Sequence, residues 1–483
     1  MLFNSLDFAI FLPLVFLLYW FIAQKNLKFQ NALIVIASYF FYGWWDWRFL
    51  SLIIFSTVVD YLVGQNLRTE EKLSKRKILL WTSITVNLGF LGFFKYYNFF
   101  IENFIDAFSL FGIQINANSL NIILPVGISF YTFQTLSYTI DVYKKKLEPT
   151  QDFIAFSAFV CFFPQLVAGP IERATNLLPQ FYKKRTFEYY KAVDGMRQIL
   201  WGLFKKVVIA DNCAEFANQI FNNSADMNSS TLVLGAIFFT FQIYGDFSGY
   251  SDIAIGTSRL FGFDLKQNFA TPYFSRDIAE FWRRWHISLS TWFRDYLYIP
   301  LGGSRGSSWM KVRNTFVIFL VSGFWHGANW TFIFWGALNA IYFLPLLLTN
   351  NNRKNLGVIA EGKLLPSFSE LFAMLTTFAL TVFAWIFFRA ENLNHAFSYI
   401  EGIFTKSFFI IPKGFELSNM FSIAIIICFF VCIEWIGRKD NFAIENISKD
   451  SRLGRNILYL IILLILFVFG NYDSEIEFIY FQF

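Results

Sequence analysis

Charged side chains are scarce in this chain of 483 residues, where Asp, Glu, Lys and Arg together make up 15% of the composition. Hydrophobic residues make up 56% and aromatic residues 21%, and the mean hydropathy is +0.46. So little charge excludes a soluble globular protein and indicates a polytopic membrane protein. The formal charge of +6 is therefore not expected to reflect a nucleic-acid partner. The distribution of the basic residues along the chain is expected to report membrane topology instead.

Cysteine and histidine are also rare. The cysteines lie in or beside apolar segments and are expected to be small buried hydrophobes; they are Cys161, Cys213, Cys428 and Cys432. The chain lacks a CxxC pair and a Cys/His cluster with zinc spacing, so neither a disulfide framework nor a metal site is expected. No basic residues precede the first apolar run, which predicts a retained first helix rather than a signal peptide. An internal repeat is also missing, which weighs against a transporter built from paired halves.

Apolar segments instead recur along the whole length, and the first four are expected at 8–23, 32–45, 49–63 and 78–94. Lys and Arg are concentrated in alternate connections, and an excess of basic residues marks the cytoplasmic side of a membrane. The N-terminus is therefore predicted to lie outside. The last residues, 471–483, carry no Lys or Arg, so the C-terminus is predicted outside as well.

The middle of the chain, from residue 124 to residue 339, is interrupted by Gly, Pro and ionisable residues. Broken helices survive in a membrane only where protein or a water-filled cavity covers their backbone, so this part is predicted to enclose a chamber. Asp246 and Asp252 are expected to pair there with buried Arg or His. Residues 176–200 are predicted to lie along the membrane surface, with a solvated connection as the alternative, and 350–369 to form a polar surface loop.

His326 is the sharpest candidate for a functional residue, because apolar runs lie on both sides of it and an ionisable group at membrane depth is a functional candidate by default. Gly323 and Gly327 bracket it and can admit a substrate or another backbone, while Asn329 adds a polar group nearby. The same small residues also serve helix packing. A histidine that only satisfies a neighbouring carbonyl therefore remains the alternative.

Five blocks are too long and too unusual for generic membrane sequence. They are LPVGISFYTFQTLSYTIDVY at 124–143, FFPQLVAGPIERATNLLPQF at 162–181, YGDFSGYSDIAIG at 244–256, EFWRRWHISLSTWFRDYLYIPLGG at 280–303 and SGFWHGANWTFIFWG at 322–336. Together they closely resemble the membrane-bound O-acyltransferase family, and within it the bacterial branch of alginate O-acetylases. The resemblance is dense from 124 to 339 and looser toward both ends.

The resemblance implies an all-α polytopic fold with roughly a dozen transmembrane and re-entrant helices around a central funnel. It divides a single integral-membrane domain into N-terminal helices at 1–123, a core at 124–349 and C-terminal helices at 370–483. His326 in FWHGANW matches the family's essential histidine, and His286 in RRWHISLS matches a second polar position. The third histidine, His395, lies outside every motif and is expected to be ordinary surface.

Acyl transfer to a hydroxyl explains why histidine is needed, because a hydroxyl is a weak nucleophile until a base takes its proton. His326 is predicted to be that base. His286 is predicted to polarise the thioester carbonyl or to orient the donor's pantetheine arm, with a purely tethering role as the alternative. Residues predicted to contact the donor are Arg283, Arg284, Trp325 and Asn329; for the two arginines, lipid headgroups are the alternative ligand. A Gly-x-Ser-x-Gly elbow is missing, so no covalent acyl-enzyme is indicated.

The resemblance therefore implies an O-acetyltransferase of the bacterial inner membrane that uses cytoplasmic acetyl-CoA and no bound cofactor. Its acceptor is expected to be an extracytoplasmic polysaccharide of the alginate type, with a separate extracytoplasmic acetyltransferase as a partner. Peptidoglycan O-acetylation and D-alanylation of teichoic acid are alternatives within the class. A transporter or flippase without covalent chemistry, and a scaffold of a secretion complex, are alternatives from other classes.

Overall fold

The chain is described by a computed structural model that covers residues 1–113, 119–167, 169–412, 417–471 and 478–479. These residues form helices and connections and contain no strand, which confirms the predicted all-helical class. They fold as two compact units. Unit 1 comprises 1–192 and 257–266, and unit 2 comprises 193–256 and 267–483.

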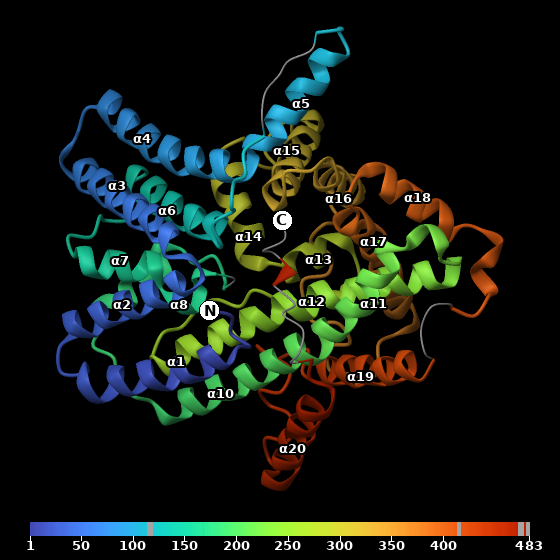
Figure 1. The fold of residues 1–483 in the computed structure, drawn as a ribbon. Coiled ribbons are helices and arrows are strands. Elements are labelled where there is room, and N and C mark those ends of the chain that lie inside the picture. The colour runs from blue at the N-terminus through green and yellow to red at the C-terminus, as the bar shows by residue number, and fades with distance from the viewer. Residues whose placement is uncertain (114–118, 168, 413–416, 472–477, 480–483) are drawn as a thin grey trace. The chain divides into compact units, whose positions relative to one another are not determined.

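Unit 1 is built around helices that pack side by side in the blue and teal part of Figure 1, where α3 contacts α4 and α6, and α2 contacts α7. Its helices are α1 (Leu6–Leu17), η1 (Leu18–Ile22), α2 (Leu27–Asp46), η2 (Trp47–Phe49), α3 (Leu50–Thr69), α4 (Leu73–Leu91), η3 (Gly92–Tyr96), α5 (Tyr97–Ser109), α6 (Ile128–Tyr143), α7 (Phe153–Cys161), α8 (Phe163–Leu166), α9 (Ala174–Leu177) and η4 (Leu178–Tyr182).

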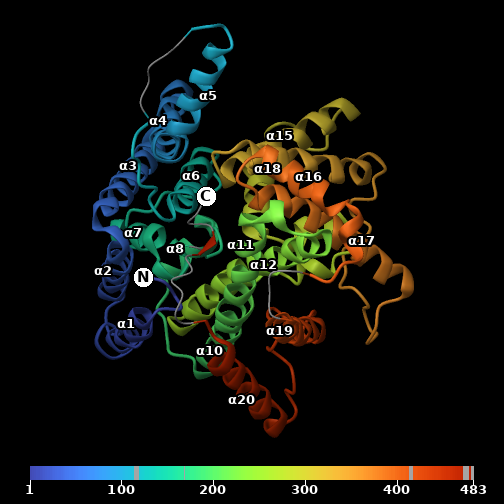
Figure 2. The same cartoon turned by 45° about the vertical axis from the view of Figure 1, so that its right-hand side comes forward.

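Two helices cross the boundary between the units, α10 (Tyr189–Leu203) and α12 (Ser229–Leu260). The other helices of unit 2 are η5 (Phe204–Ala210), α11 (Asp211–Asn222), η6 (Ser224–Asp226), η7 (Pro272–Phe274), α13 (Ile278–Arg284), α14 (Ile287–Phe293), η8 (Arg294–Tyr298), α15 (Ser308–His326), α16 (Trp330–Leu348), α17 (Phe368–Arg389), α18 (Leu393–Ile403), η9 (Lys406–Phe409), α19 (Leu417–Ile436) and α20 (Arg452–Phe469). The hairpin of α15 and α16 packs against α17, as Figure 2 shows.

Seven helical stretches in the described part of the chain are long and apolar enough to cross a membrane. They are Leu27–Thr69, Leu73–Ser109, Ser229–Leu260, Trp330–Leu348, Phe368–Arg389, Ser418–Ile436 and Arg452–Phe469. The prediction of a multi-pass membrane protein is therefore confirmed. The four N-terminal segments expected from hydropathy correspond to α1 with η1, α2, α3 and α4.

Two expectations for individual side chains need correction. Cys161 and Cys213 are buried as predicted, but Cys428 and Cys432 are exposed on α19, because a helix face that meets lipid is apolar without being buried. Arg185 belongs to the stretch predicted to lie along the membrane surface, but it is buried and donates hydrogen bonds to the side-chain oxygens of Gln30 and Asn31. The guanidinium group of Arg185 therefore stabilises the packing of helices within unit 1.

Candidate active site

His286 lies in a sharp turn between α13 and α14, where its backbone is left-handed with φ 43° and ψ 54°. Asn268, fully buried, holds this turn. Its backbone carbonyl accepts from the N–H of Ile287 at 2.9 Å, and its side-chain oxygen accepts from the N–H and the hydroxyl of Ser288 at 3.2 and 2.9 Å. The unusual conformation is thus fixed by hydrogen bonds from both sides.

The same Asn268 oxygen fixes the tautomer of His286. His286 Nδ1 lies 3.1 Å from it, and because that oxygen accepts from the Ser288 N–H, Nδ1 must be the donor. Burial lowers the pKa of His286 to about 3, which keeps the imidazole neutral at physiological pH. Nε2 is then the nitrogen with the lone pair. In this tautomer Nε2 can accept a hydrogen bond but cannot donate one to a carbonyl oxygen.

His326 is the last residue of α15, and Gly327 and Asn329 form the tight connection to α16. A Cβ on Gly323 would lie 2.2 Å from the carbonyl oxygen of Phe332, and one on Gly327 would lie 2.2 Å from the Phe332 ring. Both glycines therefore serve the close packing of the two helices. Asn329, predicted to contact the donor, caps α16 by accepting from the N–H of Thr331.

Aromatic rings enclose His326, which is 3% exposed. The rings of Trp335 and Phe388 lie 5.2 Å from the imidazole between centroids, and the ring of Trp325 lies 4.9 Å away. Trp325 also lies 6.1 Å from His286. The structure thus brings both motif histidines to the same tryptophan, from segments 40 positions apart in the sequence.

A cavity of about 680 Å³ opens beside this cluster within unit 2. The α15 residues that line it include Thr315, Phe319 and Ser322. Spacings of four and three residues place these side chains on one face of the helix, and His326, four residues beyond Ser322, is the next position on that face. Ile287, which follows His286, also lines the cavity. The cavity therefore leads along α15 to within one helical turn of His326, which does not itself line it.

The two arginines ahead of His286 have different surroundings. Arg283 lines the cavity and donates to the backbone carbonyls of Asn352 and Asn355. Arg284 forms an ion pair with buried Glu280 at 3.0 Å and donates to the carbonyl of Gly357. Both guanidinium groups therefore hold the connection between α16 and α17, and only Arg283 also faces the cavity.

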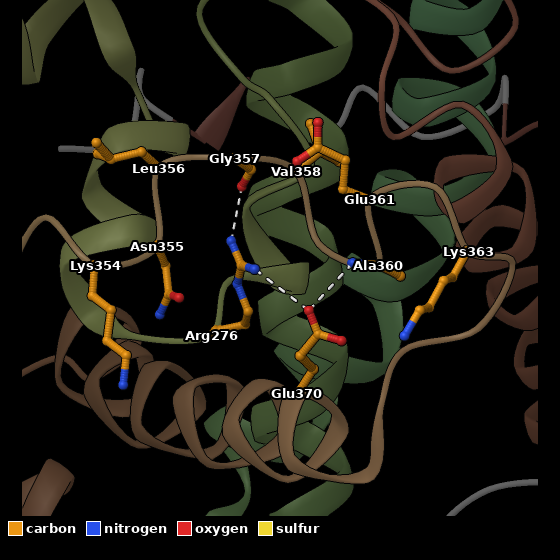
Figure 3. A pocket seen from close by; sticks show the side chains of 10 residues that line it. All are labelled: Arg276, Lys354, Asn355, Leu356, Gly357, Val358, Ala360, Glu361, Lys363 and Glu370. Carbon is orange, nitrogen blue, oxygen red and sulfur yellow. Dashed lines mark hydrogen bonds and ion pairs between the residues drawn. The ribbon is translucent and has the colours of Figure 1, made fainter.

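A second, polar pocket of about 300 Å³ lies under the same connection. Figure 3 shows Arg276 donating to the carbonyl of Gly357 and pairing with Glu370, which in turn accepts from the N–H of Ala360. Arg438 donates to the carbonyls of Ile359, Ala360 and Lys363. Arginines thus fix the polar connection predicted as a surface loop at several backbone positions.

Asp246 and Asp252 are both paired, as predicted, but with lysine rather than arginine or histidine. Lys206 Nζ lies 2.9 Å from Asp246 and 2.7 Å from Asp211, and all three are buried. Lys205 Nζ lies 2.6 Å from Asp252. The sequence feature that could have predicted these partners is the Lys205–Lys206 pair inside the apolar run 203–210, because two ammonium groups in an apolar run need buried carboxylates.

Phe478 and Ile479 are residues that sequence reasoning did not connect with the site. Phe478 is fully buried, and its ring lies 4.4 Å from that of Tyr250 and 5.8 Å from that of Phe247. The N–H of Ile479 donates to Asp246 at 2.6 Å. Phe247 in turn contacts His286, with centroids 4.6 Å apart. These two C-terminal residues therefore pack beside the His286 turn.

The third histidine, His395, belongs to α18 and lies half-buried, with Nε2 3.2 Å from the hydroxyl oxygen of Ser224. It lies outside the cluster around Trp325 and lines none of the cavities described above. It therefore offers a matched control for substitutions of the other two.

Several known proteins are similar to this chain. The model of the membrane-bound O-acyltransferase family, MBOAT, matches residues 144–355. A probable alginate O-acetylase of Pseudomonas aeruginosa is 42% identical over 84% of this chain and 75% of its own length. One from Pseudomonas putida is 36% identical over the whole of both chains. A peptidoglycan O-acetyltransferase of Helicobacter pylori is 37% identical over 83% of this chain and 80% of its own length.

Proposed function

The chain belongs to the membrane-bound O-acyltransferase family, and on that premise we propose that it moves acetyl from cytoplasmic acetyl-CoA toward hydroxyls of an extracytoplasmic polysaccharide. The observation that carries this proposal is the convergence of His326 and His286 on Trp325 beside a large cavity. The names of the similar proteins from Pseudomonas aeruginosa and Helicobacter pylori support acetyl as the transferred group and alginate or peptidoglycan as the acceptor.

The cavity supports entry of an extended thioester donor. It is lined mainly by apolar and aromatic side chains and includes Arg283, Arg294 and Arg353. An apolar cavity with a few polar groups suits a pantetheine arm, and guanidinium groups suit phosphate. Lys354 and Lys363 lie on the same connection as Arg353, and an excess of basic residues is typical of the cytoplasmic side. The donor then enters from the cytoplasm.

His326 acts as the general base. It removes the proton from the acceptor hydroxyl while the oxygen attacks the thioester carbonyl, and the resulting imidazolium returns the proton to the departing thiolate. A positioned base of this kind accelerates the reaction roughly 10²–10⁴-fold. His286 accepts a hydrogen bond through Nε2, which fits an amide N–H of the pantetheine arm. This role replaces carbonyl polarisation, for which a donor would be needed.

The acceptor hydroxyl at His326 belongs to a separate extracytoplasmic acetyltransferase that approaches from the other side of the membrane, and this partner passes the acetyl group on to the sugar. In that scheme this chain carries the acetyl group across the bilayer. Peptidoglycan and alginate-type exopolysaccharide are both acceptors of acetyl named among the similar proteins. The identity of the partner then decides which polymer is modified.

Substitution of His326 by Ala tests the proposal. In membranes and in purified protein, the His326→Ala variant is expected to lose acetyl transfer from labelled acetyl-CoA by at least 10²-fold, because the base is removed. The His395→Ala variant is the matched control and is expected to retain full activity. Unchanged transfer by a folded His326→Ala variant would refute the mechanism.

The same assay separates the alternatives. A transporter or a scaffold would neither hydrolyse nor transfer acetyl from acetyl-CoA. For a scaffold, polymer acetylation in cells would also survive the loss of His326. A D-alanyltransferase would leave acetyl-CoA intact and consume a D-alanyl thioester. Mass analysis of the alginate-type polymer and of peptidoglycan from cells with and without the protein distinguishes the two acetyl acceptors.

A further inference from the structure

Three helices of unit 1 form a polar cluster that includes none of the residues assigned to acyl transfer. Each contributes two polar residues four positions apart, a spacing that places both on one face. They are Ser56 and Asp60 of α3, Ser83 and Asn87 of α4, and Thr135 and Thr139 of α6, and all are 0–1% exposed. Both α3 and α4 belong to candidate membrane spans. The cluster therefore lies inside the helical bundle.

The six residues form two layers. In the first, the side-chain oxygen of Asn87 accepts from the hydroxyls of Ser56 and Thr135, at 2.8 and 3.1 Å. In the second, Asp60 Oδ1 accepts from the hydroxyls of Ser83 and Thr139. The Asn87 amide joins the layers by donating to Asp60 Oδ2 at 2.9 Å. Among the described residues, every neighbour that contacts the carboxylate is a neutral donor.

The charge of Asp60 has no counterpart in the described part of the chain, where no Lys, Arg or His lies within salt-bridge distance of it. A buried carboxylate without an opposite charge is costly, more so in a membrane. A proton on the carboxyl group would have to be donated to one of these hydroxyl oxygens, whose own hydrogen would then turn away from Asp60. A bound metal cation would supply the charge and leave the hydroxyl lone pairs of Ser83 and Thr139 as ligands.

We propose that Asp60, Ser83 and Thr139 bind one sodium ion. Carboxylate and hydroxyl oxygens are the ligands of hard cations. One carboxylate balances one positive charge, so a divalent ion would leave a net charge buried in the bundle. Thr139 Oγ1 lies 3.0 Å from Asp60 Oδ1, so the ion takes the place of the hydroxyl hydrogen that points at the carboxylate, and so short a spacing suits sodium better than the larger potassium ion. This site is independent of the acyl-transfer function and stabilises unit 1.

Thermal unfolding of the purified full-length protein tests the site. Unfolding midpoints are compared in sodium chloride, potassium chloride and N-methylglucamine chloride at equal ionic strength. Sodium is expected to raise the midpoint by roughly 2 °C or more, because a ligand that binds only the folded state stabilises it by mass action. The increase is expected to shrink as the pH falls, since protons compete for the same carboxylate.

Three variants make the result specific. Asp60→Asn and Thr139→Val remove a ligand and are expected to lose the sodium-dependent shift, whereas Ser56→Ala alters only the neutral layer and is expected to keep it. Thr139→Val serves if Asp60→Asn fails to fold, because it retains the carboxylate. Equal midpoints of the unmodified protein in the three salts, at neutral and at alkaline pH, would overturn the proposal and leave Asp60 as a site for a proton only. A shift retained in Thr139→Val and Asp60→Asn would overturn the assignment of these ligands.

Discussion

Two sets of buried carboxylates, one in each unit, are neutralised in different ways. In unit 2, Asp211 and Asp246 share Lys206, and Asp252 pairs with Lys205. In unit 1, Asp60 is surrounded by hydroxyl and amide donors alone among the described residues. A lysine is a counter-ion fixed by the chain itself, whereas a set of neutral oxygens leaves the charge to an exchangeable ion.

Position in the fold explains the difference. The lysines belong to η5, the π-helix that continues α10, and a Cβ on Gly249 of α12 would lie 2.8 Å from the carbonyl oxygen of Gly202. This close approach brings the Lys205–Lys206 pair to the carboxylates of α12. Asp246 also accepts from Ile479 next to the His286 turn. Fixed ion pairs therefore support the region of the candidate site, where the proposed reaction needs atoms held in place.

Replacing Lys206 with Met is expected to have the largest effect on stability. It removes the partner of both Asp211 and Asp246, and the loss of one member of a buried ion pair costs about 3–5 kcal/mol. The variant is expected to unfold at a much lower temperature and to accumulate poorly in membranes, as measured by thermal unfolding in detergent. Lys191→Met, which breaks exposed pairs at 3.4–3.5 Å, is the control and should cost no more than about 1 kcal/mol. Equal effects of the two would show that the buried pair is not structural.

Replacing Lys205 with Met is expected to have a smaller effect. Asp252 keeps the hydrogen bond from Gln198 at 2.8 Å, and its side chain is 12% exposed against 3% for Asp246. A partly hydrated carboxylate that keeps one donor loses roughly 1–3 kcal/mol. The same thermal assay is expected to place this variant between Lys191→Met and Lys206→Met. A loss larger than that of Lys206→Met would contradict the ranking by burial.

Much of the candidate site could be predicted from the sequence. Both histidines follow from their motifs, and the need of Asp246 and Asp252 for buried partners follows from their apolar surroundings. The identity of those partners could not be predicted, because it depends on which face of η5 meets α12. The roles of Gly323, Gly327 and Asn329 were also undecided, since spacing is the same for helix packing and for substrate access. Only the contacts with Phe332 and the cap on α16 decide between them.

The cluster around Asp60 illustrates the opposite case. Its residues form three pairs at a spacing of four inside segments expected to be helical, so the pattern is present in the sequence. Each pair alone is unremarkable in an apolar helix, where Ser, Thr and Asn also bond to their own backbone. The site exists only when three helices place the pairs at the same level. Sequence periodicity shows which residues share one face of a helix. Only the folded bundle shows which other helices lie against that face.

Replacing Asp60 with Asn in sodium-free medium is expected to have the smallest effect. The substitution weakens one of the hydrogen bonds to Ser83, Asn87 or Thr139, but it also removes the charge that no described side chain balances. These terms oppose each other, so the free energy of unfolding should change by less than about 1 kcal/mol. Sodium should then separate the unmodified protein from the variant, which it cannot stabilise. A loss as large as that of Lys206→Met, with or without sodium, would show that the carboxylate is needed for packing itself and that the two units treat buried charge alike.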